Sequence, residues 1–314
     1  MSRRRRSIAY RTTIMTGLAA TLAAVSSAHD TWILPIRAAV AVGETATFEA
    51  TSAMHFPDPD VPVSADRVVA ARLRIGRALS TLDPVKSPAK VLRFAAVAPT
   101  AGIATAWMES RPREIDMEPD QVEHYLGEIG ALDTIGKQWN QAGRPAWHET
   151  YSKVAKTFVR IGAGEDRSWA DPVDAPFEMV PEDDPTRVQP GGTFAIRVLE
   201  NGAPVPDLGV GAVAGGGEAT MRRTDKDGRV SFLLDRTGPW LLRAVHIQPD
   251  EKPGAWRSRF TTLTLFVAND AVAPVKSEGC GDDARRRSGL RTGDHGSAKG
   301  PDLDVPAWKV LLLQ

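Results

Sequence analysis

The chain has 314 residues, enough for two domains of ordinary size, and its 39 basic residues balance 39 acidic ones. This balance excludes a protein that binds nucleic acid or an anionic membrane through an excess of positive charge. The sequence has one cysteine, Cys280, so an intramolecular disulfide is excluded and the stability of the fold must come from packing.

The first 28 residues match the pattern of a secretory signal peptide. Four arginines at 3–6 come before an apolar stretch at 14–25, and Ser26-Ser27-Ala28 supplies the small residues of a cleavage site. The apolar stretch is too short to span a bilayer comfortably, and no later stretch approaches the length of a membrane span. We therefore expect cleavage between Ala28 and His29, which gives a periplasmic or secreted protein without an integral membrane segment.

Cleavage at this point changes the net charge and the chemistry of His29. Loss of the five arginines that precede it leaves 34 basic residues against 39 acidic ones, a net charge of −5. As the first residue, His29 offers an α-amine and an imidazole, which together close a chelate ring on a metal ion once they lose their protons. Such nitrogen ligands suit Cu(II) or Ni(II) better than Mg or Ca. The alternative is a polar residue left at a frayed end.

Two further histidines are candidate metal ligands beside His29. His55 precedes two aspartates at the end of a predicted strand, and His246, the weakest of the three candidates, ends a strand in the second half. His124 and His148 are expected on helix surfaces as ordinary solvated histidines. No pair of histidines has H-x-x-x-H spacing, so a structural zinc site is not indicated and any metal site has to be assembled from distant parts of the chain.

The mature chain is predicted to be mainly β, with two β-sandwich-like domains. The first, residues 29–165, has short strand candidates separated by Pro and Gly, and a helical insertion at about 119–157. One face of an amphipathic helix is predicted by apolar residues at i, i+3, i+4 and i+7, namely Val122, Tyr125, Leu126 and Ile129. The segment from Trp147 to about Lys156 is also predicted to be helical before the chain turns into a strand.

The second domain, residues 173–268, is predicted to be a seven-stranded sandwich of the Ig-like or transthyretin-like type. Asn201-Gly202 and Asp227-Gly228 have the composition of hairpin turns. Alternation along one predicted strand places Phe194, Ile196 and Val198 on one face. Along another strand it does the same for Val230, Phe232 and Leu234. Residues 271–314 are polar and rich in glycine, so a disordered tail is predicted there.

No catalytic residue is predicted, and we expect a protein that is not an enzyme. The sequence lacks a G-x-S-x-G motif, a P-loop and a dinucleotide-binding fingerprint, and Cys280 lies in the tail rather than beside a positioned histidine. The run EMVPEDDP at 178–185 supplies four carboxylates of the kind that Ca²⁺ accepts. Its prolines and its spacing favour a charged linker instead.

Several segments resemble a bacterial family of exported proteins. They include AHDTWILP, MHFP, ETYSKVAKTF and the stretch from FEMVPEDDPTRV to GPWLLRAVH, and they cover about residues 29–268. Members of that family are described as periplasmic components of nickel uptake or cobalt transport. The resemblance therefore implies a divalent transition metal, Ni or Co, and a membrane transporter of metal ions as partner. The second half alone is similar to transthyretin-like and other Ig-like modules, which serve many functions.

Three functions remain open on the sequence. The first, which we favour, is an exported metal-binding protein that supports uptake or delivery of Ni, Co or Cu. The second is a β-sandwich interaction module that binds a sugar, a peptide or a membrane protein without metal. The third is a copper redox enzyme with an N-terminal histidine brace, for which Trp139 and Trp147 are candidates to contact a polysaccharide.

Overall fold

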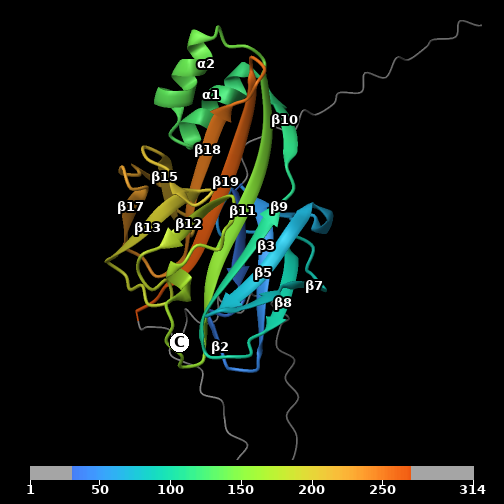
Figure 1. Cartoon of the computed structure of the whole chain (residues 1–314), viewed down its shortest axis with the longest axis vertical. Coiled ribbons are helices and arrows are strands. Elements are labelled where there is room, and N and C mark those ends of the chain that lie inside the picture. The colour runs from blue at the N-terminus through green and yellow to red at the C-terminus, as the bar shows by residue number, and fades with distance from the viewer. Residues whose placement is uncertain (1–29, 270–314) are drawn as a thin grey trace, which may run out of the picture.

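The computed structural model describes residues 30–269, and their fold is mainly β, as the sequence predicts. The strands form three sheets, and a small helical region lies at one end of the molecule (Figure 1). The predicted signal peptide, His29 and the predicted tail at 271–314 lie outside the described residues. Within residues 30–269, no helix has the length and apolar character needed to cross a membrane.

The first sheet has five strands in the order β1-β3-β8-β7, with β4 paired to β3, and all its pairings are antiparallel. Its strands are β1 (Asp30–Pro35), β3 (Thr45–Ala53), β4 (Val61–Pro62), β7 (Asp83–Val85) and β8 (Leu92–Val97). In β3, the buried Ala46, Phe48 and Ala50 alternate with the more exposed Thr45, Thr47 and Glu49, the pattern of a strand with one face on a core.

The second sheet has ten strands and runs through the whole molecule in the order β16-β15-β18-β19-β11-β9-β5-β6, with β2 and β10 also paired to β11. The strands from the first half of the chain are β2 (Ala39–Val40), β5 (Val68–Ile75), β6 (Ala78–Thr81), β9 (Gly102–Ser110), β10 (Arg113–Met117) and β11 (Trp147–Ile161). The strands from the second half are β15 (Gly209–Ala214), β16 (Thr220–Arg223), β18 (Gly238–Pro249) and β19 (Ala255–Val267).

The third sheet has four strands, with β12 and β17 on either side of β13 and β14 paired to the end of β13. They are β12 (Phe177–Pro181), β13 (Gly192–Glu200), β14 (Ala203–Pro204) and β17 (Arg229–Leu234). The predicted alternation is confirmed, because Phe194 lies opposite Phe232 and Ile196 opposite Val230, and all four are buried. Residues 173–268 therefore hold eight strands, β12 to β19, rather than the seven predicted.

Two hydrophobic cores lie on opposite halves of the long sheet. The first sheet packs on one half through Phe48 and Phe94, and the third sheet packs on the other through Phe194 and Phe232. Figure 1 shows the two resulting lobes, one blue to cyan and one yellow to orange, with β11 and β19 between them. Each lobe has the two-layered arrangement of a sandwich, because each sheet has one apolar face to bury.

The two lobes share strands rather than a flexible linker. β11 and β19 pair in parallel over ten residues of each strand, from His148 opposite Ala255 to Thr157 opposite Thr264. These hydrogen bonds cross the boundary predicted between 165 and 173. That residues 173–268 fold alone stays a prediction; in such a fragment, the β11-facing edge of β19 would lose its partner.

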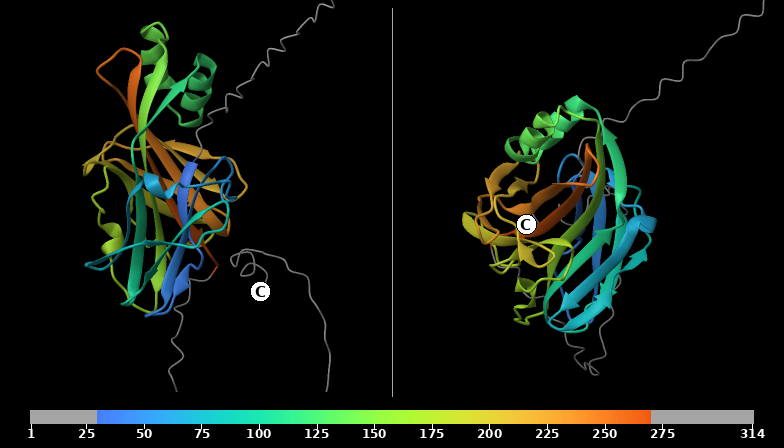
Figure 2. Two further views of the ribbon diagram at one scale, coloured as in Figure 1. Left: turned by 90° about the vertical axis from the view of Figure 1, so that its right-hand side faces the viewer. Right: turned by 45° about the horizontal axis from the view of Figure 1, so that its top comes forward.

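The helical region covers one end of β11, β18 and β19, as Figure 2 shows in green. Helix α1 (Pro119–Glu128) buries Val122, Tyr125 and Leu126, so the predicted amphipathic face is confirmed. A π-helical turn, η2 (Leu132–Gly136), and helix α2 (Lys137–Gln141) follow it. Two single 3-10 turns, η1 (Ala65–Arg67) and η3 (Ser168–Ala170), complete the helical elements of the described residues.

The prediction of a helix from Trp147 to about Lys156 is wrong, because this segment is the first two thirds of strand β11. Its β-branched and aromatic residues favour a strand. Its backbone N–H and C=O groups form hydrogen bonds with β10 in antiparallel pairing and with β19 in parallel pairing. A local sequence pattern cannot reveal such partners. The helical insertion therefore ends at Gln141, and His148 lies on a strand.

The two predicted turns behave differently. Asn201 and Gly202 both have positive φ, 49° and 80°, and join the paired strands β13 and β14 as a hairpin turn requires. Asp227-Gly228 also forms a turn, with φ of 72° at Gly228, but it connects β16 to β17, which lie in different sheets. The composition of this second pair predicts the turn and not the pairing of its strands.

Candidate functional site

The structure places His55 and His246, the two candidate ligands that it describes, far apart. His55 is exposed in the turn after β3, where the neighbouring Phe56 carbonyl accepts a hydrogen bond from Gly216. Gly215 in turn donates to Pro239, near the start of β18. His246 comes seven residues after Pro239 on β18. Along an extended strand, this places His246 about 23 Å from Pro239.

His246 already has neighbours of its own. Its Nδ1 lies 3.0 Å from the Glu200 carboxylate, and its ring lies 6.1 Å from that of Phe177. His124 and His148 are both exposed and pair with Glu128 and Asp116. Among residues 30–269, no group of three or more His, Cys, Asp or Glu side chains is placed to hold a metal ion. A site built on His29 involves a residue outside this range.

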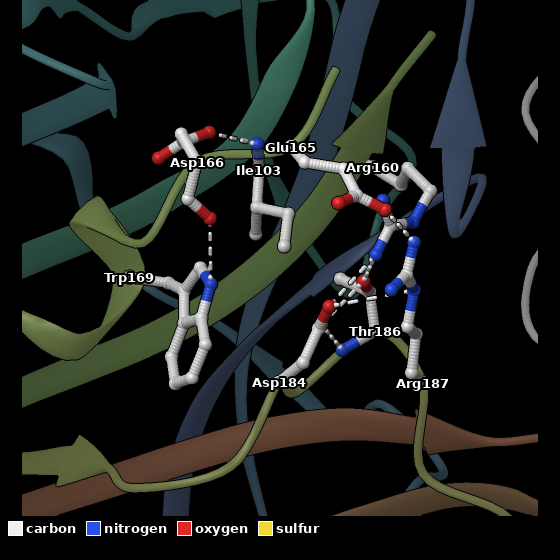
Figure 3. Close-up of polar contacts among 8 residues, drawn as sticks. All are labelled: Ile103, Arg160, Glu165, Asp166, Trp169, Asp184, Thr186 and Arg187. Atoms are coloured by element: carbon white, nitrogen blue, oxygen red, sulfur yellow. Dashed lines mark hydrogen bonds and ion pairs between the residues drawn. The ribbon is translucent and has the colours of Figure 1, made fainter. Parts of the chain in front are cut away.

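The acidic run at 178–185 is not a linker. Glu178 lies on β12, fully buried and paired with Lys156. Asp184 accepts hydrogen bonds from Arg160 at 2.9 Å and from the Thr186 hydroxyl at 2.7 Å, as the close-up in Figure 3 shows. These internal partners occupy the carboxylates, and they connect the segment to β11, where Arg160 is located.

Figure 3 also shows how the segment 162–176 is connected to the first lobe. Asp166 accepts a hydrogen bond from the backbone N–H of Ile103 on β9 at 2.7 Å, and its carbonyl accepts one from the indole of Trp169 at 2.9 Å. Arg187 pairs with Glu165 at 2.6 Å. This cluster of ion pairs is a structural connection between the two lobes.

A cavity of about 410 Å³, which we call the central pocket, lies where β11 and β19 meet the first lobe and helix α1. Pockets for small molecules in proteins have about 300 to 1,000 Å³. Its walls combine apolar side chains with hydroxyl and charged groups. They are Thr31, Ser52, Val61, Pro62, Val63, Ser64, Arg67, Met108, Ser110, Arg113, Ile115, Met117, Tyr125, Glu149, Tyr151, Lys153 and Phe260.

Strand β11 supplies the polar centre of the central pocket. Side chains alternate along a strand, so Glu149, Tyr151 and Lys153 share one face, and all three line the cavity. Lys156 lies on the opposite face, where it donates to Glu178 and to the carbonyl of Met179. The same strand thus serves the pocket with one face and the second core with the other.

The carboxylate of Glu149 is buried and held by three donors. Tyr125 donates to its Oε1 at 3.2 Å, Trp147 donates to its Oε2 at 2.9 Å, and the Ser258 hydroxyl also donates to Oε1. Burial raises the pKa of Glu149, although these hydrogen bonds act in the opposite direction. The donors come from α1, β11 and β19, so three elements position this single carboxylate.

The ammonium group of Lys153 lies among aromatic rings at the side of the same cavity. Its Nζ is 5.0 Å from the centre of the Phe260 ring, 5.6 Å from that of Tyr151, and 3.2 Å from the Thr31 hydroxyl. Loss of water contact lowers the pKa of Lys153 to about 8. Arg67, whose guanidinium is 5.7 Å from the Tyr151 ring, adds to this lowering by repulsion.

Sequence reasoning missed the central pocket because it assigned the segment ETYSK to a helix. Interpreted as a strand, the same five letters place Glu149, Tyr151 and Lys153 on one face, which is the signal that was available. The two tryptophans considered for contact with a polysaccharide, Trp139 and Trp147, are each 1% exposed and belong to the packed cluster around α1. They therefore form no surface for a polymer.

The chain belongs to the family of the domain of unknown function DUF4198, which matches residues 26–248. This match includes the strands β1, β9, β10 and β11 that form most of the central pocket. No curated protein matches the sequence.

Among solved structures, the chain is similar to a DUF4785 family protein from Legionella pneumophila (11% identity, TM-score 0.21, covering 68% of this chain and 50% of that one). It is also similar to the adhesin InvE of Yersinia pseudotuberculosis (14%, 0.21, 75% and 58%) and to fibronectin(III)-like modules of CbhA from Clostridium thermocellum (10%, 0.18, 75% and 93%). The chain thus spans only about half the length of the first two.

Proposed function

We propose that this chain is an exported binding protein that holds a small molecule in the central pocket. The observation that supports this proposal most directly is that two charged side chains, Glu149 and Lys153, lie on one face of β11 in the wall of a cavity of about 410 Å³. Ionisable groups with shifted pKa values in a cleft are typical of functional sites. The signal-peptide pattern supports the export, and the pocket favours the metal-independent binding module among the three functions considered.

The test uses the two methionines in the pocket wall as reporters. In protein labelled with ¹³C at the methionine methyl groups, benzyl alcohol, benzoate, benzylamine and methyl glucoside are added singly at millimolar concentration. We expect at least one of them to shift the signals of Met108 and Met117 and to leave Met179, in the core of the other lobe, unchanged.

Two valines provide the variant and its control. Val61 lines the pocket and is 50% exposed, so Val61→Trp should obstruct the cavity without straining a core and weaken binding at least about tenfold. Val97, on β8 and 57% exposed, lies outside the pocket wall, so Val97→Trp should leave binding unchanged. Shifts that survive Val61→Trp, or the absence of any shift at Met108 and Met117, would contradict the proposal.

The second candidate function is the metal-binding protein for uptake or delivery of Ni, Co or Cu through a membrane transporter. One observation favours it: Asp30 is paired with Ala53 in the register of β1 and β3, only two residues before His55. The first described residue, Asp30, therefore lies at the end of the first sheet from which the turn with His55 follows. A chelate of the His29 amine and imidazole with His55 is compatible with that placement.

Calorimetric titration of tag-free protein with Ni(II), Co(II) and Cu(II) tests this second candidate. One residue added ahead of His29 displaces the amine from its chelate ring, so affinity should fall at least about tenfold, and His55→Ala should lower it as well. His246→Ala should have no effect, because His246 pairs with Glu200 at 3.0 Å and lies seven residues along β18 from Pro239, the part of that strand connected to the turn that carries His55. Equal binding by the extended and native termini would contradict the candidate, whatever the order of the metals.

A further inference from the structure

We infer that the central pocket selects an uncharged molecule, a flat apolar body that carries one hydrogen-bond acceptor. This inference rests on the proposed function and names the class of its ligand. A ligand that enters the pocket loses part of its contact with water, and a charged group regains that free energy only from an opposite charge that is not already paired. The partners of the charged side chains in and behind the wall therefore decide which ligand charge is accepted.

The carboxylate of the wall is committed to the protein. Glu149 is 3% exposed, and hydrogen bonds from Tyr125, Trp147 and Ser258 occupy both of its oxygens. A carboxylate held in this way has little capacity left for a cationic ligand, because a cation would have to displace donors that the fold has already placed.

The ammonium group of Lys153 is committed as well. Its Nζ donates to the Thr31 hydroxyl at 3.2 Å. Burial lowers the pKa of Lys153, and among the charged groups around it the Asp30 carboxylate has the largest effect, which opposes that lowering. Asp30 is also paired with Arg243 at 2.7 Å. Two carboxylates, those of Asp30 and Glu149, therefore balance two cations, and the charges inside the pocket sum to zero.

The two arginines of the wall are in contact with water. Arg113 is exposed, and Arg67 is half-buried and donates to the carbonyl of Arg111 on the surface at 3.4 Å. An ion pair with a solvated charge contributes only about 0.2–1 kcal/mol. An anion thus gains less from these arginines than it loses when it leaves water. Neither sign of ligand charge is favoured, so the wall suits an uncharged ligand.

One buried hydroxyl of the wall has a hydrogen to donate. Ser110 is 8% exposed, and its oxygen accepts a hydrogen bond from the backbone N–H of Lys153 at 2.9 Å. No atom of residues 30–269 accepts the hydrogen of this hydroxyl. The hydroxyls of Thr31 and Ser52, in contrast, bond to each other at 2.7 Å. A buried donor without an acceptor favours a ligand with an oxygen that accepts a hydrogen bond, such as a carbonyl or an alcohol.

The rest of the wall sets the body of the ligand. Apolar side chains form the sides of the cavity, namely Val63, Met108, Ile115, Met117 and Phe260. The rings of Tyr151 and Phe260 lie 5.8 Å apart at an angle of 68°, an edge-to-face pair that a flat ligand can join. An apolar cavity with few polar groups is the common form of a small-molecule site. An uncharged aromatic carbonyl compound or alcohol meets all of these conditions.

Calorimetric titration with three probes of the same shape tests the charge of the ligand. Benzamide is uncharged, benzoate carries a negative charge, and benzamidine carries a positive charge. We expect benzamide to bind at least about tenfold more tightly than the other two. Asp30→Asn removes one carboxylate from the balance, so benzoate should gain at least about threefold relative to benzamide. Asp133→Asn, at an exposed residue of η2 outside the pocket wall, is the matched control and should leave that ratio unchanged.

Ser110→Ala tests the acceptor of the ligand. It removes the available donor, so benzamide should bind about fivefold more weakly, whereas toluene, which offers no such acceptor, should bind as before. Ser80→Ala, at an exposed serine of β6 outside the pocket wall, should change neither. The comparison of the three charged and uncharged probes needs only the wild type, which keeps the inference testable if Ser110→Ala does not fold.

Two results would overturn the inference. Benzoate or benzamidine binding as tightly as benzamide would overturn the uncharged class, and benzamide binding that survives Ser110→Ala would overturn the acceptor. Shifts of Met108 and Met117 with any probe would then still support the proposed function, whereas their absence with every probe contradicts that function itself.

Discussion

Two lysines three residues apart on β11 have opposite surroundings. Lys156 is 1% exposed and lies against Glu178, which is 2% exposed, so this ion pair is closed off from any ligand. Lys153 lines the central pocket with Tyr151 and Phe260. A charge paired inside a core contributes to the fold, whereas a charge that lines a cavity lies where a molecule in that cavity would contact it. One strand thus carries a structural ion pair on one face and part of the wall of the proposed binding pocket on the other.

The largest expected effect is on the closed pair. Lys156→Met leaves Glu178 as a buried carboxylate without its cation and should lower the free energy of unfolding by about 3–5 kcal/mol. Lys153→Met at neutral pH should lower it less, by about 1 kcal/mol, because Asp30, a carboxylate that acts on Lys153, keeps its ion pair with Arg243 at 2.7 Å. Urea denaturation of both variants measures the difference. If Lys153→Met proved as destabilising as Lys156→Met, the comparison of a structural and a functional lysine would be wrong.

A smaller effect is expected at the carboxylate of the pocket. In Glu149→Gln, the amide oxygen can still accept from the Trp147 indole, while the NH₂ group faces the Tyr125 and Ser258 hydroxyls, which must turn from donors into acceptors. The charge-assisted hydrogen bonds of the carboxylate are then replaced by weaker neutral ones, at a cost of about 1–2 kcal/mol in stability. Glu114→Gln, at an exposed residue of β10, is the control in the same thermal unfolding experiment. An unchanged melting temperature would mean that Glu149 is not held as described.

The most gradual effect is a pH dependence carried by Lys153. Its pKa is lowered from 10.5 to about 8 in the folded protein, by burial first and also by Arg67, while Asp30 and Glu149 oppose the change. The folded state therefore loses this proton before the unfolded state does, and the cost of holding the ammonium is relieved as pH rises from about 8 toward 10.5. Wild-type stability should rise relative to Lys153→Met in that window, by at most about 1.4 kcal/mol per pH unit.

Paired urea denaturation series of the wild type and Lys153→Met measure this dependence, since groups that titrate in both proteins cancel in the difference. Lys137→Met, at an exposed lysine of α2 outside the pocket wall, gives the flat reference. A difference between wild type and Lys153→Met that falls with pH would have the wrong sign for a lowered pKa.

Much of the fold was accessible to local patterns. The face of helix α1, the alternation of β13 and β17, and the turn at Asn201-Gly202 were all predicted and are present. The predicted boundary of the second domain falls close to β12, but the sheet continues across it. None of the candidate site predicted from histidines reappears in the central pocket, and the segment that carries its Glu149 and Lys153 had been predicted as a helix.

The sequence by itself determined those elements whose reasons lie within a few residues, such as a helical period, a strand period and a two-residue turn. Only the tertiary structure decided that 147–161 is a strand and that Glu149 and Lys153 face a cavity. The physical reason is the distance along the chain between partners. Glu149 receives hydrogen bonds from Tyr125, 24 residues before it, and from Ser258, 109 residues after it, and β11 takes its strand form by pairing with β19.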